Sequence, residues 1–224
     1  MASPVWEQKS RENLKSFLKK NQKVIQSLYE KDANEEDTRT FVNDMLVSGL
    51  GYDRYEELTS EMRIQHEFAD IGIRIAEDEK AILEVKRVKL LLKEQHLRQV
   101  KTYAANKGLP WAILTNGRIW QVYRISDTTP ITDHLLFSVD ILAEVPLAIK
   151  VEKLWMLSRE AMKRDVLSTE WKLVSALSPE SIKKALLSEA VLKSLRTQLR
   201  LNSKQLVDIS KLKQALVSLL KDFS

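Results

Sequence analysis

Two acidic residues and a lysine suggest hydrolytic chemistry in the first half of the chain. Glu84 and Lys86 follow the apolar run Ala81-Ile82-Leu83, and Asp70 lies upstream of them. Hydrolysis of a phosphodiester at neutral pH needs a metal ion that activates water and neutralises transition-state charge, and Mg²⁺ prefers hard oxygen ligands. A lysine beside such an ion can orient the nucleophile or stabilise developing negative charge. These residue types predict a metal-dependent phosphodiesterase site.

The segment that carries Glu84 and Lys86 is predicted to be a β-strand. Residues 81–86 form a short apolar run that ends in the charged pair, which is typical of a strand leaving a core. Side chains two residues apart on a strand leave the same face, so Glu84 and Lys86 are expected side by side. Leu83 and Val85 are then expected to turn toward the core on the other face.

Asp70 is expected to face Glu84 from a neighbouring strand. It lies at the start of a strand-like segment, and a polar turn at residues 76–80 can fold that segment back against the next strand. The alternative is a surface strand whose outer face is merely charged, because Glu-x-Lys is a weak signal in a chain with 30% charged residues. The pattern alone leaves both interpretations open.

Two helices are predicted ahead of these strands. Apolar residues at three- and four-residue intervals indicate an amphipathic packing helix over residues 5–31. Asn34 is a good N-cap, and the acidic residues after it suit the first turn of a second helix. Gly49 and Gly51 are expected to end that helix.

The remaining elements of the first half predict a mixed sheet. Alternating apolar residues over 58–75 indicate two strands, and a helix is expected over 88–106. Asn116-Gly117 is a strong hairpin signal between strands at 111–115 and 118–124. This order predicts an α/β fold with a mixed central sheet flanked by helices. Residues 126–133 are interpreted as a loop, and 140–146 as the joint to the C-terminal third of the chain.

The C-terminal third is predicted to be helical and basic. Helices are expected at about 148–158, 178–201 and 204–221. From Leu147 onward there are 15 Lys and Arg against 8 Asp and Glu, whereas the whole chain has 36 against 31. A basic module suits a nucleic-acid partner, although such charges can also simply solvate helix faces. We therefore expect a nuclease domain over 1–146 and a basic helical extension over 147–224.

Composition excludes several other kinds of site. The chain has no cysteine, which rules out disulfides and thiolate metal sites, and its three histidines are too few and scattered for a histidine-rich metal cage. His96 is interpreted as structural. Neither a signal peptide nor an apolar stretch of membrane-spanning length is present, so a cytoplasmic protein without membrane association is expected.

Several motifs taken together are specific, although each alone is weak. They are Asn34-Glu-Glu-Asp-Thr-Arg39, Leu50-Gly51-Tyr52, Asp70, Ile82-Leu83-Glu84-Val85-Lys86, Gln99-Val-Lys-Thr-Tyr103 and Ala112-Ile-Leu-Thr-Asn-Gly-Arg-Ile-Trp120. In order and spacing, residues 34–141 resemble the N-terminal nuclease domain of the type I restriction enzyme R subunit and its stand-alone relatives. The resemblance implies a restriction-endonuclease-like fold of the PD-(D/E)xK superfamily.

The resemblance also implies roles for the central residues. Asp70, Glu84 and Val85 match the metal-binding positions, and Lys86 matches the catalytic lysine. The implied cofactor is Mg²⁺, with Mn²⁺ as a substitute, and the implied reaction is cleavage of DNA.

Residues on two helices match the family's supporting positions. A helix-borne glutamate is expected to complete the acidic cluster. Glu36 matches it by distance from Arg39, whereas Glu35 lies closer to the apolar face of the helix, and both are retained. Gln99 and Tyr103, four residues apart on one helix face, match residues that contact substrate or steady the catalytic groups. Without the family context, they would be interpreted as a polar pair on a solvated helix.

One departure from the R subunit concerns its ATP-driven motor. The chain contains no Gly-x-x-x-x-Gly-Lys-Ser/Thr phosphate-binding loop. We therefore expect no DNA translocation by this chain itself, and any cleavage to be local or directed by a protein partner that supplies specificity or a motor. A second hypothesis is a nucleic-acid- or protein-binding adaptor that keeps the fold with weak or no turnover. The sequence does not indicate an oligomeric state.

Overall fold

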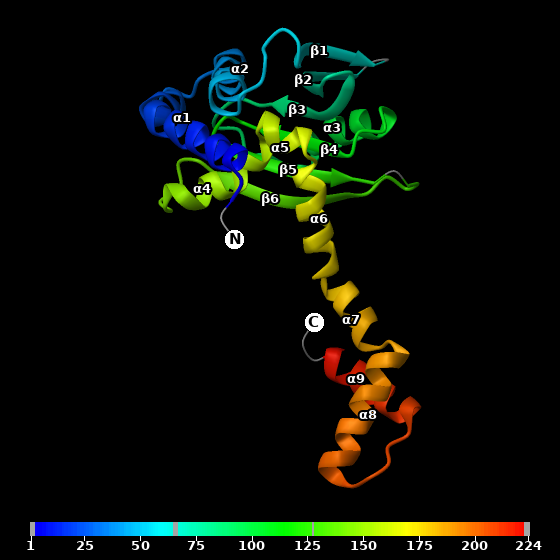
Figure 1. Ribbon diagram of the computed structural model, residues 1–224. Coiled ribbons are helices and arrows are strands. Elements are labelled where there is room, and N and C mark those ends of the chain that lie inside the picture. The colour runs from blue at the N-terminus through cyan, green and yellow to red at the C-terminus, as the bar shows by residue number, and fades with distance from the viewer. Residues whose placement is uncertain (1–2, 65–66, 127, 222–224) are drawn as a thin grey trace. The chain divides into compact units, whose positions relative to one another are not determined.

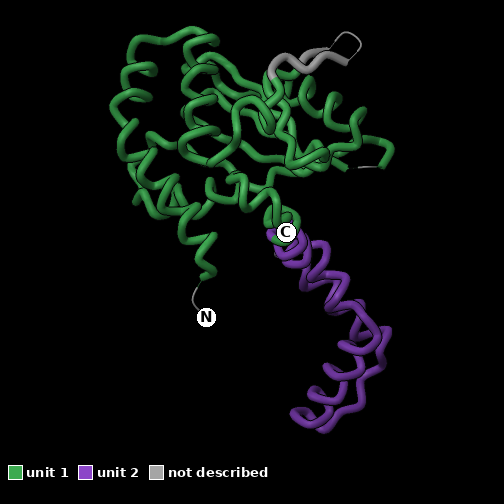
Figure 2. The backbone as a smooth tube through the Cα atoms, turned by 45° about the horizontal axis from the view of Figure 1, so that its top comes forward, with its two compact units in different colours: residues 1–169 green, residues 170–224 purple. Residues whose placement is uncertain are grey.

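The computed structural model describes residues 3–64, 67–126 and 128–221. Contacts divide the chain into two compact units, Met1–Thr169 and Glu170–Ser224 (Figure 2). The first unit holds the sheet and all of the candidate catalytic residues. The domain boundary predicted after residue 146 stays a prediction. The first compact unit extends beyond it, to Thr169.

A six-stranded sheet forms the centre of the first unit (Figure 1). Its strands lie in chain order, and only the pair β3 and β4 is parallel, the other neighbours being antiparallel. The sheet is therefore mixed, as predicted, and the fold is α/β and restriction-endonuclease-like. The strands are β1 (Leu58–Ile64), β2 (Glu67–Ile75), β3 (Asp78–Val85), β4 (Trp111–Thr115), β5 (Ile119–Ile125) and β6 (Asp133–Asp140).

The β2–β3 hairpin sets the register of the candidate site. Its turn is formed by Ala76 and Glu77, shorter than predicted, and Ala76 adopts a positive φ of 54°. Ile71 pairs with Leu83 across the two strands. Extending this antiparallel register by one residue puts Asp70 opposite Glu84, so the two acids share a face of the sheet.

Two helices precede the sheet, as predicted. Helix α1 spans Val5–Glu30, and α2 spans Glu35–Asp44 before a π-helical turn at Met45–Gly49. The side chain of Asn34 caps α2 by accepting a hydrogen bond from the amide of Asp37 at 2.8 Å. This cap fixes where the first turn of α2 begins, and with it the position of the acids there.

Helix α3 (Glu94–Asn106) connects the parallel strands β3 and β4. It packs on strands β2 to β5 through a hydrophobic cluster that includes Leu97, Val100 and Tyr103. The predicted start at residue 88 was wrong, because His96 Nδ1 accepts a hydrogen bond from the amide of Lys93 and so starts the helix there. Residues 86–93 form an irregular connection, in which Val88 is buried.

The hairpin at Asn116-Gly117 is confirmed, but strand β6 was not predicted. Gly117 has a positive φ of 75°, as a tight turn of this kind requires. Strand β6 covers the whole segment between the predicted loop and the predicted joint, and it includes the last residue of the one and the first residue of the other. Its pairing with β5 contains a register shift between Val122 and Tyr123, which interrupts the alternating pattern.

Helices after the sheet differ in detail from the predicted set. The first unit adds α4 (Leu147–Leu154), a 3₁₀ turn at Trp155–Leu157, α5 (Arg159–Lys163) and the start of α6 (Val166–Ala176). Helix α4 contacts β6 and α1. No helix among the described residues combines the length and apolar character needed to cross a bilayer.

The second unit is a small helical module. The single helix predicted over 178–201 is instead two helices, α7 (Pro179–Leu186) and α8 (Glu189–Ser203), because Ser188 has an extended backbone and begins a new helix. The last helix, α9 (Ile209–Lys221), starts later than predicted, after a left-handed residue at Lys204.

Candidate active site

Glu84 and Lys86 form an ion pair at the end of β3. Lys86 Nζ lies 2.5 Å from Oε1 of Glu84, so the two side chains share a face of the strand, as predicted. Glu84 is only 3% exposed, and residues 81–85 are buried on both faces of the strand. A merely charged surface strand is therefore excluded. Oε2 of Glu84 is buried and has no hydrogen-bond partner.

Asp70 is held at two points beside the same pair. Its Oδ2 accepts a hydrogen bond from the backbone amide of Val85 at 2.7 Å, and its Oδ1 accepts one from Nη2 of Arg39 at 2.7 Å. The first contact joins β2 to β3, and the second joins β2 to α2. Asp70 is thus fixed beside Glu84 by the strand and by the helix together.

Arg39 was not predicted as a site residue, and it links the acids of α2 to Asp70. Its Nη1 lies 2.5 Å from Oε2 of Glu36, and its Nη2 lies 3.8 Å from Oε1 of Glu35. Its Nε is buried without a partner. The sequence signal was the spacing of three and four residues from the two glutamates, which puts all three side chains on one helix surface.

The structure separates the two candidate glutamates of α2. The charge of Glu35 acts on both Glu84 and Lys86, whereas Glu36 is among the causes of neither pKa shift. The side chain of Glu35 is 41% exposed and that of Glu36 is 75% exposed. Glu35 is therefore the less exposed of the two and its charge reaches the pair, whereas Glu36 is a solvent-facing partner of Arg39.

Burial and neighbouring charge change the proton affinity of the pair. Burial, together with the negative charge of Asp70, raises the pKa of Glu84 to about 7, against the opposing effect of Lys86. Burial alone would lower the pKa of Lys86, but its hydrogen bond with Glu84 and the carboxylates around it raise the pKa overall. Near neutral pH the site therefore holds a protonated lysine beside a carboxyl group close to its titration point.

The donor set suits a hard divalent cation. Glu84 Oε2 is a buried oxygen without a partner, and a second carboxylate stands opposite it across two strands. A metal ion can satisfy a buried carboxylate oxygen that lacks hydrogen bonds, and oxygen is the ligand that Mg²⁺ prefers. Within residues 3–64, 67–126 and 128–221, however, no group of three or more histidine, cysteine or acidic side chains is arranged to hold a metal.

The two predicted residues of α3 lie in different settings. Tyr103 is buried in the hydrophobic cluster beneath α3, and burial and the charge of Glu79 raise its pKa. The ring of Tyr103 fills the interface between α3 and the sheet, and its role at the site remains a prediction. Gln99 is half-buried one helical turn closer to the start of α3, and its role remains a prediction.

His96 lies closer to the ion pair than its interpretation as a structural residue implied. Burial lowers its pKa, and the charge of Lys86 lowers it further while that of Glu35 raises it. The charges of both Lys86 and Glu35 therefore reach the imidazole. No sequence pattern pointed to this, because a histidine in the first turn of a helix has many structural uses.

Residues 34–135 match the family described as the type I restriction enzyme R protein N terminus. Over these residues the chain is similar to the N-terminal domain of the R protein. Neither a curated protein nor a solved structure matches the chain.

The matched range contains the whole candidate site. Helix α2 with Arg39, strands β2 and β3 with the two acids, and helix α3 all lie inside the matched range. The family thus supports a relationship to nuclease domains. Helix α1, most of β6 and all later helices lie outside the matched range.

Proposed function

We propose that this chain cleaves phosphodiester bonds of DNA in a reaction that depends on a divalent metal ion. The observation that carries the proposal is the arrangement at Glu84. Its Oε1 accepts a hydrogen bond from Lys86, and its Oε2 is buried without a partner. Asp70 lies opposite it on the neighbouring strand. The similarity of residues 34–135 to the R-protein N-terminal family supports the same chemistry.

The residues have distinct roles in this proposal. Asp70 and Glu84 would hold the ion, with the backbone carbonyl of Val85 as a third oxygen. When bound, Mg²⁺ or Mn²⁺ supplies Lewis acidity and lowers the pKa of water. Lys86 stabilises negative charge that develops on the phosphate. It also orients Glu84 by donating a hydrogen bond to Oε1 of that residue. Arg39 orients Asp70, and Glu35 adds negative potential that favours a cation.

The basic second unit suits the same substrate. Arg196 and Arg200 lie on α8, and the unit as a whole carries an excess of basic residues. Phosphate neutralisation supplies most non-specific affinity for DNA, so this unit would raise the affinity of the chain for its substrate. A protein partner would supply sequence specificity or a motor, since the chain has no phosphate-binding loop of its own.

The test is cleavage of plasmid, linear and single-stranded DNA with Mg²⁺ or Mn²⁺. We expect wild-type protein to nick or cut at least one substrate, and Glu84→Gln and Lys86→Met to lose at least about 100-fold in rate. Chelation of the metal should abolish cleavage. Equal cleavage by wild type and both variants would reject the site.

One observation favours a second candidate, a DNA-binding adaptor without turnover. Both acids already have cationic partners within the chain, Arg39 on Asp70 and Lys86 on Glu84. Such internal ion pairs would compete with a metal ion. Metal-independent DNA binding by the wild type, with no cleavage under any of the conditions above, would support the adaptor.

A further inference from the structure

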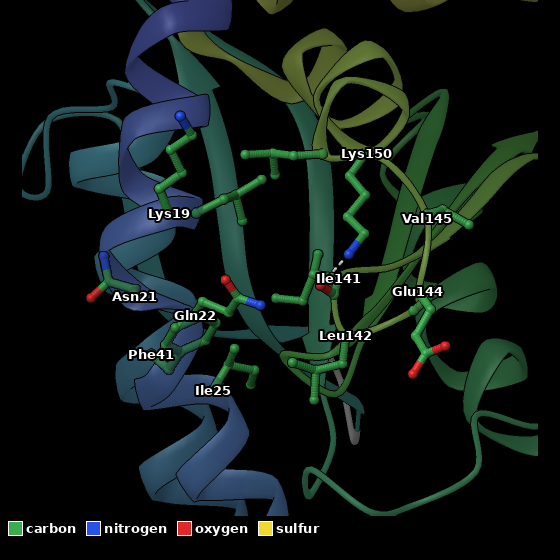
Figure 3. Close-up of a pocket in the computed structure, with 13 residues that line it drawn as sticks. Lys19, Asn21, Gln22, Ile25, Phe41, Ile141, Leu142, Glu144, Val145 and Lys150 are labelled. Atoms are coloured by element: carbon green, nitrogen blue, oxygen red, sulfur yellow. Dashed lines mark hydrogen bonds between the residues drawn. The ribbon is translucent and has the colours of Figure 1, made fainter.

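A pocket separate from the candidate active site lies between α1 and the chain after β6 (Figure 3). It has a volume of about 360 Å³ and combines apolar walls with a few polar groups. Leu18, Ile25, Phe41 and Leu142 contribute apolar surface, and Lys150 contributes an ammonium group. All of these residues belong to the first unit. Small-molecule sites commonly have this size and this mixture of walls.

Lys150 is the unusual member of this pocket. The residue is only 8% exposed, and its Nζ donates one hydrogen bond, to the carbonyl oxygen of Ile141 at 2.9 Å. Among the described residues no carboxylate pairs with it. An ammonium group has three donors, so two remain, and a buried charge is ordinarily matched by an opposite one.

The other polar groups lie around this ammonium. Figure 3 shows the Lys150 side chain extending from α4 into the pocket and the Gln22 amide pointing toward the same space from α1. Glu144 is exposed, and its carboxylate points away from the ammonium. Lys19 adds a second positive charge on α1. The pocket therefore offers one buried positive charge, that of Lys150, with the exposed side chains of Gln22 and Lys19 at its rim.

We propose that this pocket binds a small apolar carboxylate, with its carboxylate on Lys150 and its hydrocarbon part against Phe41, Ile25 and Leu142. A single buried ammonium matches one negative charge, and Glu144 beside the pocket disfavours a doubly charged head group. The volume accommodates about twelve non-hydrogen atoms if each occupies about as much space as a water molecule, about 30 Å³. This site is independent of the proposed nuclease activity.

The test is an NMR titration of isotopically labelled full-length protein with octanoate, octanol and octyl phosphate, without metal or DNA. We expect octanoate to bind with a dissociation constant of about 1 mM or below and to shift the amides of residues 141–145. Octanol should bind about tenfold more weakly, because it lacks the charge. Tighter binding of octyl phosphate than of octanoate would overturn the assignment of a carboxylate.

Two variants and a control make the result specific. Lys150→Met keeps the length of the side chain without its charge and should weaken octanoate binding at least about tenfold. Ala143→Trp should abolish binding by filling the pocket. Lys23→Met, an exposed position on α1 that does not line the pocket, should leave the affinity unchanged. Undiminished octanoate binding in either Lys150→Met or Ala143→Trp, or shifts confined to other surfaces, would overturn the proposal.

Discussion

The backbone amide of Val85 donates a hydrogen bond to Oδ2 of Asp70 at 2.7 Å, and so ties the last residue of β3 to the acid of the neighbouring strand. Val85 is fully buried, so its amide has no access to solvent. Asp70 therefore supports the fold as well as the proposed chemistry. A loss of activity on its replacement must be separated from a loss of stability.

Asp70→Ala should lower the free energy of unfolding by about 1–3 kcal/mol, because it leaves the Val85 amide without an acceptor. Asp70→Asn keeps an acceptor oxygen and should cost less. Urea unfolding of the two variants beside the wild type measures the difference. Equal stability losses in the two variants would contradict a structural role for this hydrogen bond.

Glu84 should make the protein less stable as pH rises. The folded-state pKa of Glu84, about 7, lies above the ordinary value of 4.5, so the folded protein binds the proton more tightly than the unfolded chain does. The contribution of protonated Glu84 to the free energy of unfolding is fully present below about pH 4.5 and is lost as pH rises through about 7.

We expect the wild type to lose about 2–3 kcal/mol of unfolding free energy between pH 5 and pH 8 beyond any loss in Glu84→Gln, which does not titrate there. Urea unfolding of both proteins at the two pH values gives the comparison. A wild-type protein that gains stability relative to Glu84→Gln over this range would show that burial is not the dominant influence.

The two glutamates of α2 provide a matched pair. Glu35→Gln should reduce metal-dependent DNA cleavage at least about tenfold, because the charge of Glu35 acts on Glu84 and Lys86. Glu36→Gln should change it less than about threefold, since Glu36 is largely solvent-exposed. Initial cleavage rates at saturating Mg²⁺ compare the two. A larger loss of cleavage rate in Glu36→Gln than in Glu35→Gln would show that Glu36 is the α2 glutamate that acts at the site.

Much of the fold could be predicted from local signals. Asn34 with the acids after it marked the start of α2, and Asn116-Gly117 marked the hairpin, because capping and turn chemistry depend on adjacent residues. Strand β6 was missed because its alternation of apolar and polar residues is interrupted. The interruption lies where its register with β5 shifts, and that shift depends on the pairing of the two strands. The break before α8 was missed since apolar periodicity continues across it.

The site was predicted less completely, for a related reason. The ion pair of Glu84 and Lys86 follows from their two-residue spacing on one strand. Arg39, by contrast, reaches Asp70 only because α2 is positioned against the sheet, a tertiary relationship that no local pattern contains. The choice of Glu35 over Glu36 and the setting of Tyr103 depend on the same packing.

Arg196 and Arg200 on α8 test whether the second unit meets DNA. The double variant Arg196→Glu, Arg200→Glu should weaken DNA binding at low salt and reduce the slope of log affinity against log salt by about 2. The charge-conserving variant Arg196→Lys, Arg200→Lys is the control and should keep the slope. Fluorescence anisotropy over a range of salt concentrations gives both quantities. An unchanged slope in the charge-reversed protein would show that these arginines of the second unit do not contact DNA phosphates.

The most direct test of the central claim is a Mn²⁺ titration followed by electron paramagnetic resonance, which reports bound ion without requiring turnover. We predict that the wild type binds Mn²⁺ at a site that Mg²⁺ competes for, and that Asp70→Asn and Glu84→Gln each weaken this binding at least about tenfold. Wild-type protein that binds no Mn²⁺, or that binds it with the same affinity as both variants, would contradict a metal centre between these two carboxylates.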